Sequence, residues 1–121
     1  MKLKVLEDAL SVCKVASVAD IDLDAGFFFI GKTGEETSLV CRTEDAPIHA
    51  LARDDGWRGL RVEGPLDFSL VGILAGISGA LAEAAIPLFA VSTYDTDYIL
   101  VKAKHLTRAV AALNAAGYGV G

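Results

Sequence analysis

The chain has 121 residues, of which 53% are apolar and 22% are charged, and its formal net charge is −5. This length allows one compact domain, or two very small ones that share a core. The acidic balance argues against nucleic acid and against an anionic membrane surface as partners, because phosphate binding requires clustered lysine and arginine. No such cluster is visible along the sequence.

The only two cysteines, Cys13 and Cys41, stand in apolar surroundings and lack the spacing of a metal or redox motif. This favours buried, reduced thiols over a disulfide or a reactive thiol. Residues 1–10 lack the apolar segment and the small-residue cleavage site of a secretory signal. We therefore expect a cytoplasmic protein.

The first half of the chain reads mainly as strands. Short apolar runs predict strands at residues 10–16, 27–31, 38–42 and 59–63. The acidic segment SVADIDLDAG, between the first two runs, is too short and turn-like for an amphipathic helix. Further turns are predicted at residues 45–47 and, as a tight turn before Trp57, at Asp54, Asp55 and Gly56.

The second half adds two helices. Helical patterns cover residues 72–85 and 106–116, the latter with Gly117 as a C-terminal stop, and strands are predicted at 88–93, 98–101 and 118–120. From residue 57 the order is strand, helix, strand, strand, helix, strand. This predicts an α+β, ferredoxin-like (βαββαβ) fold, in which two helices cover one face of an antiparallel sheet.

One apolar segment is long enough to span a bilayer. Residues 70–91 carry a single charge, and Gly72 and Gly76 match a helix-packing motif of membrane helices. However, Glu83 lies inside the segment and Pro87 interrupts the helical pattern, after which the composition becomes strand-like. A buried helix followed by a buried strand is therefore the better interpretation.

The two halves share a pattern. Residues 27–41 align without gaps on residues 88–102, an offset of 61, and each segment is an apolar run, a polar turn and a second apolar run. This predicts a duplication, with a first, degenerate unit at residues 1–58 and a second, complete unit at 59–121. An apolar sheet with one uncovered face also predicts burial against another copy.

The sequence contains few residues in patterns typical of a catalytic or metal-binding site. His49 and His105 are the only imidazoles, and neither has a nucleophile in a recognisable motif. No His or Cys pair has ligand spacing, and Asp95 with Asp97 supplies too few oxygens for calcium. We therefore predict no catalytic residues, no metal and no cofactor.

A binding site for a small zwitterion is the better prediction. In this fold the loop before the first helix approaches the turn within STYDTDYILV, and backbone amides at residues 71–73 suit a carboxylate. The ammonium would meet Asp97 or Asp95, with hydroxyls from nearby serine and threonine side chains. The alternative is that Asp95, Thr96 and Asp97 form an ordinary solvated hairpin turn.

The segment from Trp57, through VEGPLDFSLVGILAGIS and STYDTDYILV, resembles the ACT domains of small tandem-ACT proteins, a group similar to the regulatory region of lysine-sensitive aspartokinases and to CASTOR-type arginine sensors. The N-terminal part, with LSVCKVA and FFFIG, is similar to the first, reduced ACT unit of the same proteins. The resemblance implies binding of an amino acid at Asp67, Phe68, Ser69, Leu70, Val71, Gly72, Ile73, Ser92, Thr93, Tyr94 and Asp97.

The chain also departs from that family pattern. Ser69 and Leu70 replace the acidic pair that the arginine sensors carry before the helix glycine, which argues against recognition of a guanidinium. The Asp-x-Pro-Gly loop of many metabolic-enzyme ACT domains is missing, and so is a kinase domain. A chain of this kind would report to a partner or to another copy of itself.

The sequence thus predicts a homodimeric regulatory protein that binds a small amino acid and has no catalytic activity of its own. The runner-up is a structural or adaptor ACT module that acts through protein contacts and whose pocket is vestigial. A small enzyme is the third hypothesis. It would use Glu83 or Asp97 as a general base, yet neither residue has a partner within a motif.

Overall fold

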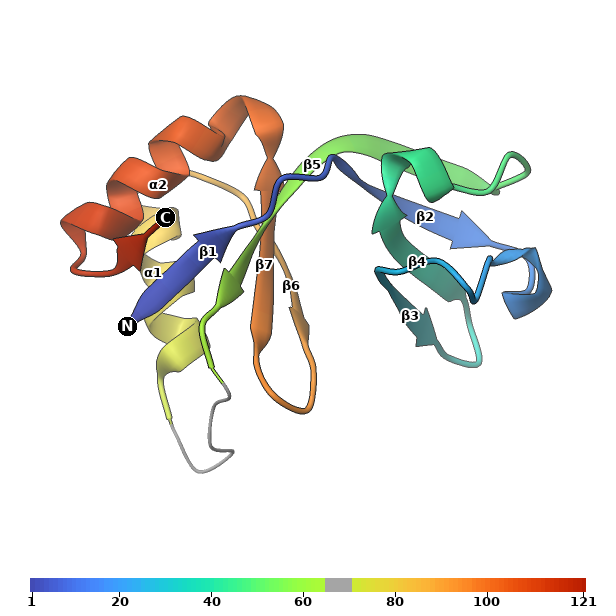
Figure 1. The fold of residues 1–121 in the computed structure, drawn as a ribbon, viewed down its shortest axis with the longest axis horizontal. Helices are drawn as coiled ribbons and strands as arrows, with labels where there is room; N and C mark the ends of the chain where they lie inside the picture. The colour runs from blue at the N-terminus through green and yellow to red at the C-terminus, as the bar shows by residue number, and fades with distance from the viewer. Residues whose placement is uncertain (65–70) are drawn as a thin grey trace. The chain divides into compact units, whose positions relative to one another are not determined.

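A computed structural model describes residues 1–64 and 71–121 of the chain (Figure 1). These residues form two compact units. The larger unit comprises Met1–Glu7 and Arg58–Gly121, and the smaller unit comprises Asp8–Trp57. The sequence predicts units at residues 1–58 and 59–121, whereas the contacts of the first seven residues group them with the C-terminal part.

The larger unit is a mixed sheet with two helices. Its strands have the order β8-β1-β5-β7-β6. In chain order the elements are β1 (Lys2–Val5), β5 (Ala52–Val62), α1 (Ile73–Glu83), β6 (Phe89–Ser92), β7 (Asp97–Lys102), α2 (Leu106–Ala115) and β8 (Gly119–Val120). From β5 onward this is the predicted βαββαβ order, so the ferredoxin-like fold is confirmed. Strand β1 is an addition, and it pairs antiparallel with β5 and parallel with β8.

The core of the larger unit lies between the helices and one face of the sheet. Helix α1 buries Ile77 and Leu81, and α2 buries Ala109 and Leu113, each pair at the i, i+4 spacing that gives a helix one apolar face. They pack against Leu3, Leu60, Val62, Ile99 and Val101 of the sheet. Within the described residues, none of the helices has the length and hydropathy needed to cross a bilayer.

The smaller unit is built from three strands of its own and the first part of β5. Its elements are β2 (Leu10–Val15), β3 (Phe28–Lys32), β4 (Thr37–Arg42) and two short 3-10 helices, Val18–Asp20 and Thr43–Asp45. The strand order is β3-β4-β2-β5. Its core is a small cluster of Cys13, Val15, Ile21, Leu39 and Cys41. A 3-10 helix therefore stands where the larger unit has α1.

The tight turn predicted at Asp54, Asp55 and Gly56 is wrong, because all three residues lie within β5. Gly56 has a φ of 83°, and the pairing of β2 with β5 shifts register opposite it, as in a β-bulge. Asp55 is held by hydrogen bonds that its Oδ1 accepts from Ser11 Oγ (2.5 Å) and Arg53 Nε (2.8 Å). The Asp55 carboxylate is therefore hydrogen-bonded while its residue remains part of the strand.

The two hairpins, β3-β4 and β6-β7, have the same register. Phe29 pairs with Val40 and Phe89 with Leu100, and every other pair of the β6-β7 hairpin also lies 60 residues after its counterpart. The short 3-10 helix that follows each hairpin, Thr43–Asp45 or Ala103–His105, repeats the same offset. The offset of 61 taken from the sequence is therefore one residue too long, and such a slip exchanges the two faces of a strand.

Candidate functional site

The loop of the β6-β7 hairpin is fixed by its own backbone and by β5. Thr93 N–H donates to Thr96 O at 2.8 Å, and Thr93 Oγ1 donates to the same carbonyl at 3.1 Å. The buried Thr96 hydroxyl donates to Val62 O, at the end of β5, over 2.6 Å. The hairpin loop is thereby held beside the last residues of β5.

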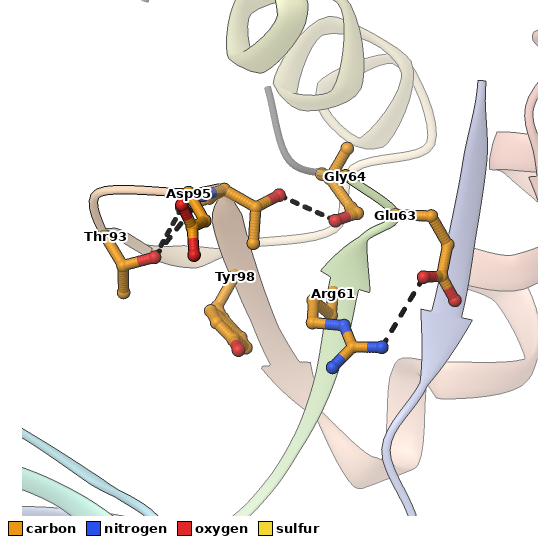
Figure 2. Close-up of a pocket in the computed structure, with 8 residues that line it drawn as sticks. Arg61, Glu63, Gly64, Thr93, Asp95 and Tyr98 are labelled. Carbon is orange, nitrogen blue, oxygen red and sulfur yellow. Dashed lines mark hydrogen bonds and ion pairs between the residues drawn. The ribbon is translucent and has the colours of Figure 1, made fainter. Parts of the chain in front are cut away.

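A pocket of about 310 Å³ lies between these two segments (Figure 2). The end of β5 and the two residues after it provide one wall, and the hairpin provides the other. The lining residues are Arg61, Val62, Glu63, Gly64, Thr93, Asp95, Thr96 and Tyr98. The pocket therefore belongs entirely to the larger unit.

The pocket contains charges of both signs. Arg61 Nη2 lies 3.4 Å from Glu63 Oε2, and both side chains are more than a third exposed, so this ion pair contributes little to stability. Asp95, on the hairpin loop, adds a second carboxylate, and Thr93 and Tyr98 add hydroxyl groups. The arrangement suits a small ligand that carries both a carboxylate and an ammonium group.

The structure brings only some of the predicted hairpin residues to this pocket. Thr93 lines it. Ser92 and Asp97 pair across the hairpin, where Ser92 Oγ donates to Asp97 Oδ1 at 2.6 Å. Tyr94 is 80% exposed at the loop tip. Whether Ser92, Tyr94 and Asp97 contact a ligand stays a prediction.

The predicted residues before α1 divide into two groups. Asp67, Phe68, Ser69 and Leu70 lie outside the described residues. Val71 is 92% exposed, and Gly72 precedes the helix with a φ of 78°, a left-handed conformation that favours glycine. Gly72 O accepts the hydrogen bond of Gly76 N–H at 2.8 Å, so the helix begins at Ile73.

Sequence reasoning missed Arg61, Glu63 and Tyr98 as lining residues. A signal was present, because Arg61 and Glu63 alternate with the apolar Leu60 and Val62 in the strand, and alternation places them on the other face. The strand was interpreted only as a structural element. The polar residues of this strand become candidate binding residues only because the hairpin loop lies beside them in the folded protein.

Other chemistry has no comparable centre in the described part of the chain. Residues 1–64 and 71–121 contain no group of three or more His, Cys, Asp or Glu side chains that could hold a metal ion. Burial raises the pKa of the Cys41 thiol to about 12, and it also raises the pKa of Cys13. Both thiols are thus protonated, and poorly nucleophilic, near neutral pH.

Solved structures with the same fold cover nearly the whole chain. Protein Atu0741 from Agobacterium tumefaciens is 31% identical, with a TM-score of 0.87 over 99% of this chain and 91% of that one. Protein VC0802 from Vibrio cholerae, described as a possible transport protein, is 21% identical, with a TM-score of 0.74 over 93% of this chain and 86% of that one.

The regulatory subunit of aspartate kinase from Thermus thermophilus is 12% identical, with a TM-score of 0.67 over 97% of each chain. At this level of identity, the likeness concerns the fold alone. A family model described as an ACT domain matches residues 52–115, which include β5, both helices, the β6-β7 hairpin and the pocket. ACT domains are regulatory modules that often bind amino acids. The chain belongs to the ACT domain family.

Proposed function

We propose that this protein is a regulatory protein that binds a free amino acid in the pocket between the end of β5 and the β6-β7 hairpin, and that it has no catalytic activity of its own. The observation that carries the proposal is that Arg61 and Asp95, which have opposite charges, both line one small pocket. A zwitterion presents the matching charges within a few ångströms of each other.

The carboxylate of the ligand would bind to Arg61. A guanidinium donates two parallel hydrogen bonds to a carboxylate, which fixes orientation as well as position. Arg61 is available for this role because its contact with Glu63 is long, at 3.4 Å, and partly exposed to water. The pocket volume of about 310 Å³ is at the small end for ligand sites, which favours an amino acid over a nucleotide.

The ammonium of the ligand would bind to Asp95, with Thr93 as a neighbouring hydrogen-bond partner. Hydrogen bonds between ionised groups are roughly twice as strong as those between neutral groups. Gly64 lines the pocket, and the predicted residues Asp67, Phe68, Ser69 and Leu70 follow it closely in sequence. We therefore retain these four residues and Val71, Gly72 and Ile73 in the proposed site.

Two features of organisation belong to the same proposal. The 60-residue offset between the hairpins, together with the 3-10 helix after each, supports a tandem of ACT-like units of which the smaller is reduced. We also propose a homodimer as the functional form. Superposition of the two units, and sedimentation at micromolar protein concentration, test these two statements separately.

The binding proposal is tested by thermal unfolding of the protein in the presence of each free amino acid. A ligand present at 100 times its dissociation constant stabilises the folded state by about 2.7 kcal/mol, which raises the melting temperature by several degrees. We expect one amino acid, or one group of similar side chains, to produce this shift. Calorimetric titration then gives its affinity.

Arg61→Gln and Asp95→Asn serve as the binding-deficient variants, because each removes one charge from the pocket with little change of size. Lys104→Gln is the matched control, since Lys104 lies on an exposed 3-10 helix away from the lining residues. The proposal fails if no amino acid stabilises the protein, or if the two pocket variants bind as tightly as the control. In that case the adaptor interpretation remains.

A further inference from the structure

On the face of the larger sheet that the helices leave uncovered, strands β1 and β5 carry a group of basic residues. Leu3 of β1 and Val62 of β5 belong to the buried core cluster that also contains Ile77, Leu81, Ala109 and Leu113 of the two helices. Side chains alternate along a strand, so Lys2, Lys4 and Arg61 lie on the opposite face. Both lysines are exposed. This cluster is hidden in the sequence because Lys4 and its neighbour Arg61 in β5 lie 61 − 4 = 57 positions apart along the chain.

The register places like charges directly opposite each other. Lys4 and Arg61 are Cα partners in the antiparallel pair of β1 and β5. Glu63 N–H donates to Lys2 O at 2.9 Å, so Glu63 lies opposite Lys2. Like charges in directly opposed positions destabilise a sheet, and Glu63 is one carboxylate among three cations. A bound anion would relieve this repulsion.

A hollow lies beside the two lysines. Its volume is about 820 Å³, and its lining residues are Lys2, Leu3, Lys4, Glu63, Asn114, Gly119, Val120 and Gly121, so two cations and one carboxylate border it. The amides of Gly119, Val120 and Gly121 already donate to Met1 O, Asn114 Oδ1 and Leu3 O, so the two lysine ammonium groups would supply the donors for a ligand. A Cβ atom at Gly119 would lie only 3.7 Å from Lys2 Cγ, so a larger residue there would fill the space beside this lysine. The volume is within the range of small-molecule sites.

We propose that Lys2 and Lys4, with the hollow beside β8, form a second binding site, for a small phosphate-bearing molecule. Lysine ammonium groups bind phosphate as point charges, and two of them on one strand face can hold a dianion or a diphosphate. The net charge of −5 disfavours long polyanions, because the protein as a whole repels them, whereas a compact anion responds to the local cluster. The ligand class therefore differs from that of the amino-acid pocket.

Inorganic pyrophosphate is the probe for this site. Titration at low ionic strength, followed by two-dimensional amide NMR, should give saturable shifts confined to residues 2–5 and 118–121. A Lys2→Gln, Lys4→Gln double variant should weaken the affinity more than tenfold. The affinity should also fall as sodium chloride is added, because salt screens the interaction of exposed charges.

A Lys14→Gln, Lys104→Gln double variant is the matched control, since it removes the same charge from exposed positions on other elements. It should keep the affinity within twofold. The proposal is overturned if pyrophosphate gives no saturable shifts, if the shifts lie elsewhere, or if both double variants lose affinity equally. The spectrum of each variant without ligand shows whether it is folded. The Lys2→Gln, Lys4→Gln variant should still bind the amino acid, because neither lysine lines that pocket. This measurement distinguishes a failure of the phosphate site from a failure of the amino-acid site.

Discussion

Ser92 Oγ donates a 2.6 Å hydrogen bond to Asp97 Oδ1, and the two residues are register partners at the end of the β6-β7 hairpin. Asp97 thus already has a partner within the protein, whereas Asp95 lines the pocket. The two aspartates of STYDTDYILV therefore have different surroundings. Asp97 is hydrogen-bonded across the hairpin, and Asp95 lines the pocket.

This difference predicts unequal effects of the two conservative substitutions. Asp95→Asn should weaken amino-acid binding by about 1.5–3 kcal/mol, the scale of a hydrogen bond to a charged group. Asp97→Asn should weaken it less, because Asp97 would act through the hairpin rather than as the main contact. Calorimetric titration of both variants with the stabilising amino acid measures the difference. A larger loss of affinity in Asp97→Asn than in Asp95→Asn would identify Asp97 as the main contact of the ligand ammonium, as the sequence alone suggested.

The hydroxyl of Thr96 is a second point where a small change should be measurable. Thr96→Val keeps the shape of the side chain but removes the hydrogen bond to Val62 O, which leaves a buried carbonyl with one partner fewer. We expect the free energy of unfolding to fall by about 1–2 kcal/mol, measured by urea denaturation. Thr107→Val, on the exposed side of α2, should change it by less than about 0.5 kcal/mol. Equal effects would mean that the Thr96 bond is not formed in solution.

The two helices end in the same motif with different residues. Ala85 N–H donates to Ala82 O and Ile86 N–H to Leu81 O. After α2, Gly117 N–H donates to Asn114 O and Tyr118 N–H to Leu113 O. Both turning residues have positive φ, 58° at Ala85 and 99° at Gly117, a region that costs an L-residue about 1–2 kcal/mol.

Replacing Ala85 by glycine and Gly117 by alanine should therefore change the free energy of unfolding in opposite directions. Ala85→Gly should stabilise the protein by about 0.5–1 kcal/mol, because relief of the strained backbone exceeds the added flexibility of the unfolded chain. Gly117→Ala should destabilise it by about 1 kcal/mol or more. Thermal and urea unfolding of both variants give the comparison. Destabilisation by Ala85→Gly would show that Ala85 contributes packing that outweighs its backbone strain.

The Cys41 thiol should make stability depend on pH under alkaline conditions. Burial raises the pKa of Cys41 to about 12 in the folded state, against 9.0 for an ordinary cysteine. Above pH 9 the unfolded chain therefore loses a proton that the folded chain keeps, and this favours unfolding. The contribution of Cys41 to stability is fully present below pH 9 and is lost as the pH rises towards 12.

Cys41→Ala isolates this effect, because other groups also titrate in the same range. The difference in unfolding free energy between the parent and Cys41→Ala should shrink as the pH rises from 8 to 10. The native protein should also react slowly with a thiol reagent at pH 8, and the urea-unfolded protein quickly. Rapid reaction of both cysteines in the native state would contradict their burial.

Local patterns in the sequence determined most elements of the larger unit. The i, i+4 spacing of Ile77 and Leu81, and the glycine at residue 117, depend only on helix geometry and on the conformational freedom of glycine. Strand β7 likewise contains the continuous apolar run Ile99, Leu100 and Val101, all buried, which the sequence predicts as a strand. These signals are contained within one element, so the ends of the observed helices differ from the predicted ones by at most two residues.

Long-range pairing decided what the sequence pattern left open. No strand is predicted from the sequence at residues 2–5, and they form β1 because β5 and β8 pair with them on both sides. Asp54, Asp55 and Gly56 have turn composition, yet Ser11 and Arg53 hold Asp55 within β5. A bulge is favourable there because the neighbouring strand supplies the hydrogen-bond partner.

The candidate sites depend on the same distinction. STYDTDYILV identified the hairpin as a place for polar chemistry, but which aspartate lines the pocket is decided by the turn between Thr93 and Thr96 and by its contact with Val62. Arg61 joins Asp95 from one side and Lys4 from the other only in the folded sheet. The sequence determines which charged residues are present. Only the tertiary structure decides which of them lie close together, because residues distant along the chain become neighbours through strand pairing.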